Sequence, residues 1–221
     1  MTATTNQTAG RIRKIAQRRT RRQDEFTADY IALVVQPGMR TVQIGGSDLG
    51  SVCLKRGARH EIIAPIAAIE ALQAECDRRQ IPTDALRGGP ALRKDDTAQP
   101  IDLVIIGPEV GFPVMAGNWR HVAAAMRENA LLVLVGADHG SSARLADALM
   151  MDAAWTLQER ACGDAAVFRK VQPVQKDRTL DTLTQASRPG RRPRGVRRGP
   201  FAGLMNRFFP AKPQDRLRTS G

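Results

Sequence analysis

Residues 41–50 read TVQIGGSDLG. Their first four residues predict a short buried strand, and the glycines after it predict a tight turn into a helix. Glycines let the backbone approach a ligand closely, and a helix N-terminus offers unpaired N–H groups. The stretch is therefore typical of the first β-turn-α unit of a nucleotide-type sheet. Its spacing departs from the dinucleotide pattern G-x-G-x-x-G, and a strand–helix turn without a ligand would need similar glycines.

On either side of this stretch, the sequence alternates between strand and helix patterns. Alternating units predict a parallel sheet with helices on both faces and right-handed crossovers. The last two strands flank Cys162-Gly163-Asp164, a hairpin signal. We therefore predict an α/β fold, a Rossmann-like doubly wound, mostly parallel sheet with a C-terminal antiparallel β-hairpin. The predicted helices are 24–36, 51–56, 66–79, 114–128 and 141–151, and the predicted strands are 41–44, 60–64, 84–87, 101–106, 130–135, 155–160 and 165–171.

Ligands of such sheets bind beyond the carboxyl ends of the strands. This rule predicts one crevice lined by residues 45–50, 64–66, 107–112 and 136–141. Asp138 and His139 follow the predicted strand 130–135, where a general base could face a substrate. The alternative is a solvated loop that leads into the next helix.

Other residues have simpler expected places. Trp119 lies on the apolar stripe of its helix and is expected in the core. His60 precedes a strand and is expected to be exposed.

The charge of the chain is uneven. Its formal total is +12, yet residues 1–22 carry +7 and residues 188–221 carry +9, which leaves −4 for the residues between. The pI of 10.9 thus reflects the ends and not a basic cleft. We predict a basic N-terminal arm (1–22), a globular domain (23–172) and a basic, mostly disordered tail (173–221).

The sequence shows no secretory signal and no paired cysteines, and we therefore expect a cytoplasmic protein. The three cysteines include no C-x-x-C pair, so neither a disulfide framework nor a metal site is indicated. No apolar run approaches the roughly 20 residues that span a bilayer. The acid-free, arginine-rich start also resembles an organelle transit peptide, which is the less favoured alternative.

The tail contains one amphipathic segment. Phe201, Leu204, Met205, Phe208 and Phe209 share one face of a two-turn helix, near residues 201–209. So short a helix is marginal in water and would need a surface to dock on. An anionic membrane surface and a groove on a protein, either a partner or its own domain, are equally favoured; the membrane would make the protein peripheral. Nucleic acid is less favoured because the arginine run lacks interleaved aromatic residues. An undocked, solvated tail is the further alternative.

Residues 24–171 resemble the class I S-adenosylmethionine (SAM)-dependent methyltransferases. The resemblance is closest to a small bacterial branch whose fourth strand ends in Asp-Gly-x-His. It rests on four segments: QPGMRTVQIGGSDLGS (36–51), IDLVIIG (101–107), NALLVLVGADHG (129–140) and TLQERACGDAAVFRKV (156–171).

The resemblance implies a set of cofactor-binding positions, some of which depart from the family pattern. Gln43 stands where the family has an acid for the amino-acid end of SAM, Ala64 where an acid binds the ribose, and Gly107-Pro108-Glu109-Val110 replaces Asp-Gly-x-His. A lost ribose carboxylate would cost on the order of 1.5–3 kcal/mol of binding. Asp48, Glu61 and Glu109 are candidates to compensate. The implied SAM-binding residues are Gln43, Gly45, Gly46, Ser47, Asp48, Gly50, Ala64, Gly107 and Glu109.

Two functions follow from the resemblance. The first is a SAM-dependent methyltransferase that acts on an unknown acceptor, with Asp138 and His139 as catalytic candidates. The second is a catalytically degenerate module that keeps the fold and acts through its basic tails. A dinucleotide-dependent oxidoreductase is a distant third, because the glycine spacing is wrong and no acid ends the second strand.

Overall fold

The computed structural model describes residues 25–92, 99–108, 110–159 and 165–173. The predicted basic arm, the hairpin turn at 162–164, Glu109 and the predicted helix at 201–209 lie outside these ranges. The described part begins in a helix that includes residues 25–34. The later elements are β1 (Arg40–Ile44), α2 (Leu49–Lys55), β2 (Arg59–Ile63), α3 (Ile66–Arg78), β3 (Leu86–Gly89), β4 (Ile101–Ile106), α4 (Phe112–Ala125), β5 (Met126–Leu134), α5 (Gly140–Met150), β6 (Trp155–Glu159) and β7 (Ala166–Lys170).

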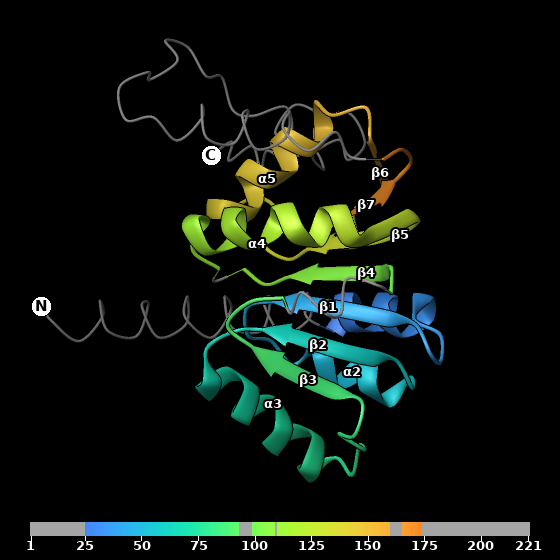
Figure 1. Ribbon diagram of the computed structural model, residues 1–221, viewed down its shortest axis with the longest axis vertical. Helices are drawn as coiled ribbons and strands as arrows, with labels where there is room; N and C mark the ends of the chain where they lie inside the picture. Colours follow the sequence, from blue (N-terminus) through green and yellow to red (C-terminus); the bar gives the residue numbers. More distant parts are fainter. Residues whose placement is uncertain (1–24, 93–98, 109, 160–164, 174–221) are drawn as a thin grey trace, which may run out of the picture. The chain divides into compact units, whose positions relative to one another are not determined.

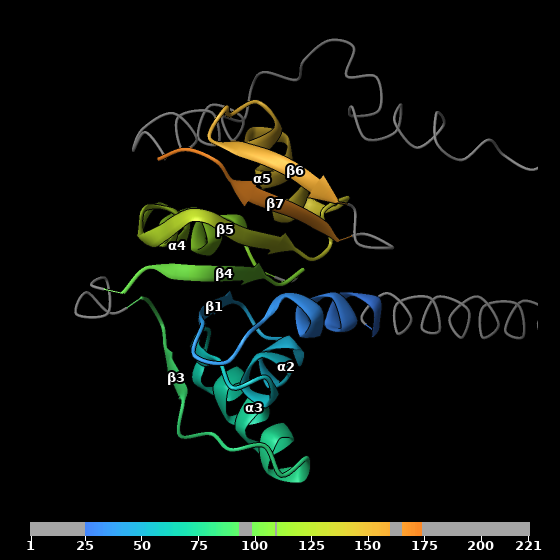
Figure 2. The ribbon, with the colours of Figure 1, turned by 90° about the vertical axis from the view of Figure 1, so that its right-hand side faces the viewer.

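These strands form one seven-stranded sheet in the order β3-β2-β1-β4-β5-β7-β6. The pairs between β1, β2, β3, β4 and β5 are parallel, whereas β7 pairs antiparallel with both β5 and β6. Figures 1 and 2 show helix 25–34, α2 and α3 on one face of the sheet and α4 on the other. The predicted doubly wound fold with a terminal antiparallel hairpin is confirmed.

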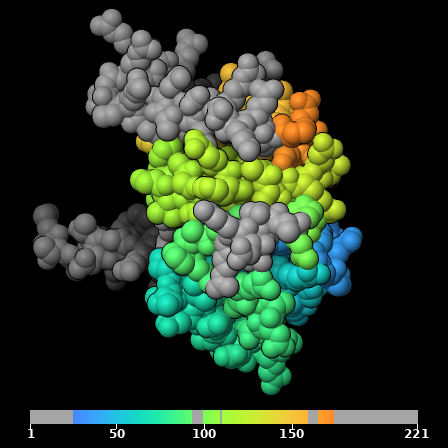
Figure 3. Space-filling model, viewed as in Figure 1, coloured from blue at the N-terminus to red at the C-terminus, as the bar shows by residue number. Residues whose placement is uncertain are grey.

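Alternation along the strands divides the core between the two faces. Leu103 and Ile105 of β4 pack with Ile31, Val35 and other residues beneath helix 25–34 and α2. Val104 and Ile106 point the other way by the alternation of a strand, toward α4. In the space-filling view, α4 and β5 form one continuous yellow-green band across the molecule (Figure 3).

The junction of α4 and β5 differs from the prediction. The apolar pattern predicts a helix through Glu128, but α4 ends at Ala125 and β5 begins at Met126. Met126 pairs with Ile101 and Leu131 with Leu103, so the register shifts between them. Asn129 has a φ of 65°, in the left-handed region. This bulge uses residues whose spacing alone continues a helix.

Smaller differences concern the ends of elements and one side chain. β3 runs from Leu86 to Gly89, two residues beyond the predicted 84–87. Trp119 is 1% exposed, as expected, and its ring lies 5.4 Å from that of Trp155. His60 is only 1% exposed, which corrects the expectation of an exposed histidine. It is buried because its ring fits against Gly50, where a Cβ would overlap His60 Nε2.

Candidate functional site

Most of the predicted site residues that the structure describes lie at the carboxyl edge of the sheet, where β1, β2, β4 and β5 end. β1 leads directly into the turn 45–48. Gly45 adopts a φ of 89°, which favours glycine, and its N–H donates to Ile63 O at 2.9 Å. The N–H of Gly107 donates to Ile44 O at 3.0 Å, so the end of β4 is joined to the last residue of β1, directly before the turn. The ends of β1, β2 and β4 therefore hold this turn through backbone bonds.

Gln43 is fully buried beneath the turn. Its Nε2 donates to Gly45 O at 2.8 Å and to Ser47 O at 3.2 Å. Its Oε1 is buried and has no hydrogen-bond partner among the described residues. A carboxylate in this place could not donate the two hydrogen bonds that the amide makes. The amide therefore suits the turn. Its unpartnered oxygen is buried, so it could accept a bond from an N–H or ammonium group only if the chain around it opened.

Val110 packs over the glycine turn. A Cβ added to Gly45 would overlap the Cγ2 methyl of Val110, which is 9% exposed. A Cβ on Gly107 would lie 3.4 Å from Gly46 O, so these two loops also touch. Part of the space that the glycine turn leaves open is thus filled by the chain itself. Sequence reasoning missed this contact because it depends on how the β4–α4 loop folds back.

The end of β2 presents no carboxylate. Ala64 is 6% exposed and belongs to an apolar cluster with Ile62 and Leu72. Glu61, a candidate to compensate for the missing acid, instead pairs with Arg40, whose Nη2 lies 3.1 Å from Glu61 Oε2. The carboxylate of Glu61 is therefore occupied in a buried ion pair.

Other predicted positions have local structural roles. Gly50 lies within α2, where a Cβ would overlap both His60 Nε2 and Leu72 Cδ2, so its missing side chain permits helix–strand packing. Asp48 is exposed and precedes α2, and its carbonyl accepts from Ser51 Oγ at 2.7 Å. Ser47 Oγ accepts from Leu49 N at 3.4 Å. Of the glycines in 45–50, only Gly45 and Gly46 belong to the turn itself.

Asp138 and His139 lie at the carboxyl edge after β5, as predicted. Both are exposed, and neither side chain has a partner among the described residues. His139 N donates to Gly136 O at 3.0 Å, and its own carbonyl accepts from Ala143 N as α5 begins. Both residues are thus held by backbone structure with free side chains.

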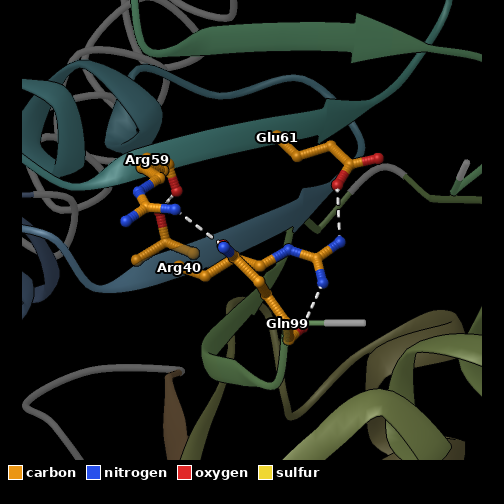
Figure 4. A network of polar contacts seen from close by, with 5 residues as sticks. Arg40, Arg59, Glu61 and Gln99 are labelled. Carbon is orange, nitrogen blue, oxygen red and sulfur yellow. Dashed lines mark hydrogen bonds and ion pairs between the residues drawn. The ribbon is translucent and has the colours of Figure 1, made fainter. Parts of the chain in front are cut away.

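The opposite, amino edge of the sheet is rich in charge (Figure 4). Arg40 at the start of β1 pairs with Glu61 and also donates to the carbonyl of Gln99. Arg59 Nη1 donates to Gln99 Oε1 at 2.7 Å. Asp102 Oδ2 accepts from Arg40 N at 2.7 Å, and its Oδ1 lies 2.6 Å from Arg127 Nε. These bonds join β1, β2, β4 and β5 at the edge remote from the predicted site.

Comparison with solved structures identifies the fold. A proposed rRNA methylase from Clostridium thermocellum superposes with a TM-score of 0.53 at 13% identity, over 67% of this chain and 95% of that protein. A proposed methyltransferase from Streptococcus mutans, solved with S-adenosylhomocysteine (SAH), has a TM-score of 0.49 at 12% identity, over 66% and 97%. No family model matches the chain, and no curated protein matches it in sequence. The chain has the fold of the class I SAM-dependent methyltransferases.

The residues present fit SAM in part. The free Oε1 of Gln43 suits the ammonium group of the cofactor, and the glycine turn provides a backbone cradle. The apolar setting of Ala64 offers nothing to the ribose hydroxyls.

Across the described ranges, no helix is long and apolar enough to cross a membrane, and no cluster of His, Cys, Asp or Glu could hold a metal ion.

Proposed function

We propose that this protein is a SAM-dependent methyltransferase whose cofactor lies at the carboxyl edge of the sheet. The observation that carries the proposal is the buried, unpartnered Oε1 of Gln43 beside the positive-φ turn at Gly45. A buried acceptor without a donor is costly, and an ammonium group would satisfy it once the turn or Val110 moves to expose the oxygen. The methyltransferase fold supports the same location.

The proposal gives each residue a limited role. Gly45, Gly46 and Ser47 would bring backbone close to the amino-acid end of SAM, and Gln43 Oε1 would accept from its ammonium group. The resemblance assigns Asp48, Ala64 and Gly107 to the remainder of the cofactor, together with Glu109, which lies outside the described residues. Because a carboxylate is missing at Ala64, we expect weaker affinity than a charge-assisted ribose contact would give.

Methyl transfer asks little further chemistry of the protein. SAM supplies an activated methyl group, and in-line positioning of the acceptor provides much of the rate. Acceptors that must lose a proton would need a base, and the free side chains of Asp138 and His139 are candidates. The acceptor itself is left open, since no described side chain defines its chemistry.

The second candidate is a degenerate module that keeps the fold without binding SAM and acts through its basic ends. It is favoured by a specific observation, the packing of Val110 onto Gly45. If Val110 keeps this position, the cofactor cannot approach the turn closely. The two candidates thus differ in whether the β4–α4 loop yields to a ligand.

Calorimetric titration of the full chain with SAM and with SAH distinguishes the candidates. The enzyme proposal predicts saturable binding, with dissociation constants at micromolar level or somewhat weaker. Gly46→Val should abolish this binding, since a side chain would stand where the cofactor approaches. Gly46 is exposed and has no positive φ, and a Cβ there would lie 3.2 Å from Ala68 Cβ, so this variant needs only a small local adjustment, whereas Gly45→Val also strains the backbone.

A second variant tests whether the SAM site is only obstructed by Val110 or does not exist. Val110→Ala removes the methyl groups over Gly45 and should strengthen binding if the site is merely obstructed. Absence of binding to either protein at millimolar ligand, with a native circular dichroism spectrum, would refute the enzyme proposal. The degenerate module would then be the better account.

A further inference from the structure

A concave pocket lies between helix 25–34, α2 and the end of α3, on the face of the sheet opposite α4. Its volume is about 330 Å³. Small-molecule sites commonly occupy roughly 300–1,000 Å³, so the pocket has room for a small ligand. None of the described residues that line it belongs to the proposed SAM site.

The inner wall of the pocket is apolar. Ala28 and Ala32 face it from helix 25–34, Val52 from α2, and Ile81 from the segment after α3. Ser51 also lines the pocket, but its hydroxyl is used within the chain, where it donates to Asp48 O at 2.7 Å. Contact with this wall therefore favours an apolar body and offers little hydrogen bonding to an uncharged polar group.

Three cations surround that wall, namely Lys55, Arg56 and Arg79, against one acid, Asp29. Arg56 Nε donates to Val35 O at 3.3 Å, and Arg79 Nε pairs with Glu75. Each guanidinium is thus anchored at Nε. Among the described residues its terminal nitrogens have no further partner, and neither does the ammonium group of Lys55. The rim therefore holds hydrogen-bond donors that are free and partly positioned.

These cations lie at the C-terminal ends of two helices, so their charge must be compared with the negative charge of the helix dipoles. Lys55 and Arg56 end α2, and Arg79 ends α3, where basic residues commonly offset the negative end of the helix dipole. Each helix end contributes about half a negative charge. The described residues that line the pocket carry a formal side-chain charge of +2. Glu75 pairs with both Arg78 and Arg79, and adding Glu75 and Arg78 to the count leaves the total unchanged, so about one positive charge remains after both helix ends are counted. The side chains therefore carry more positive charge than is needed to balance the two helix dipoles.

We propose that this pocket binds a free small amphiphile with one anionic group, such as a carboxylate or phosphate, on an apolar body. The apolar body would contact Ala32, Val52 and Ile81. The anionic group would lie at the rim, within reach of Lys55 and the terminal nitrogens of the two arginines.

Three ligands of equal chain length test the proposal: decanoate, decanol and decyltrimethylammonium. Each is titrated into the ¹⁵N-labelled full chain, and binding is followed by amide chemical-shift changes. Decanoate should bind, with the largest shifts at Ala28, Ala32 and Val52, and the ammonium compound should bind at least about tenfold more weakly. Decanoate binding should also weaken as sodium chloride is raised, because exposed charges are screened.

Variants separate the charge from the shape of the pocket. Lys55→Glu should weaken decanoate binding about five- to tenfold, the effect of reversing one exposed charge, while Lys55→Arg should preserve it. Ala32→Phe should block the pocket without a change of charge. Arg120→Glu, an exposed reversal on α4, is the matched control and should leave binding unaltered.

The proposal fails if decanoate does not bind at millimolar concentration, or if it binds no better than the ammonium compound. It also fails if Lys55→Glu is without effect, or if the shifts fall at the carboxyl edge. If the protein associates with vesicles of anionic phospholipid but does not bind decanoate, the proposal of a free ligand is wrong and the cations contact a membrane surface instead.

Discussion

The two ends of the same parallel strands are built in opposite ways. At the amino edge, Arg40, Glu61, Asp102 and Arg127 form ion pairs and charge-assisted bonds that join four strands. At the carboxyl edge, the turn after β1 is held by backbone bonds and the neutral amide of Gln43. Charge fixes the edge that is remote from the proposed site, and uncharged groups shape the edge that would receive a ligand.

This difference separates two uses of buried polar groups. A buried ion pair contributes little net stability over apolar residues of similar size, but it is costly when one partner is lost. The Arg40–Glu61 pair is therefore expected to matter mainly through the cost of losing one partner. The carboxyl edge instead retains an unsatisfied acceptor, which costs stability unless a ligand supplies a donor.

The largest expected effect breaks the charged edge. Glu61→Ala removes the buried carboxylate that pairs with Arg40 and should lower the free energy of unfolding by up to about 3–5 kcal/mol. Urea unfolding followed by far-ultraviolet circular dichroism measures the loss. The double replacement Arg40→Met with Glu61→Leu removes both charges and should cost less than the single one. An equal or larger loss in the double variant would contradict the role given to the pair.

Next is the pH dependence that buried His60 imposes. Burial lowers the pKa of His60 from 6.5 to about 4. The unfolded chain therefore binds a proton at this histidine more readily than the folded chain does. The contribution of neutral His60 to the free energy of unfolding is fully present above about pH 6.5 and is lost as the pH falls toward 4. The loss attributable to this histidine is about 3 kcal/mol. Urea midpoints measured from pH 7 to 4 should show this decline, and a slope that is unaltered in His60→Gln would refute it.

A smaller effect sharpens the comparison at the carboxyl edge. Gln43→Glu restores the acid of the methyltransferase pattern but removes both hydrogen bonds to the turn, and should cost about 2–3 kcal/mol at pH 7. A protonated carboxyl can donate one bond, so the loss relative to wild type should shrink as the pH is lowered. Urea unfolding of both proteins at matched pH tests this. Unchanged stability at pH 7 would show that the amide does not hold the turn.

The smallest effect is expected at the exposed end of the amino edge. The side chain of Arg127 is 54% exposed, so its pair with Asp102 is largely screened. Arg127→Ala should therefore cost less than about 1 kcal/mol. A loss of stability comparable to that of Glu61→Ala, measured in the same urea series, would mean that solvent exposure does not determine how much these ion pairs stabilise the fold.

The sequence predicted the fold well because periodicity is a local property. The apolar run 101–106 appears as β4 without change of bounds, and the glycine turn follows β1 as expected. The helix predicted through Glu128 was too long because a bulge in β5, set by pairing with β4, overrides local spacing. Tertiary pairing decides such a boundary.

The candidate site was predicted in location but not in detail. Position at the ends of the predicted strands indicated that Gly45, Ala64 and Asp138 would gather at one edge, and the family resemblance added Gln43. Neither could show that Glu61 turns to Arg40 or that Val110 covers Gly45, because both contacts join residues far apart in the chain. A basic residue at the start of β1 facing an acid within β2 was the available signal for the ion pair.

The paired tryptophan rings have an optical consequence. The chain contains two tryptophans, Trp119 on α4 and Trp155 on β6, and they lie 5.4 Å apart. All indole emission therefore originates at a single junction between a helix and the terminal hairpin, and fluorescence excited selectively at tryptophan rather than at Tyr30 reports on that junction. If the hairpin separates before the rest of the domain unfolds, emission will change at lower denaturant than ellipticity. The protein thus carries its own local sensor for the cooperativity of unfolding.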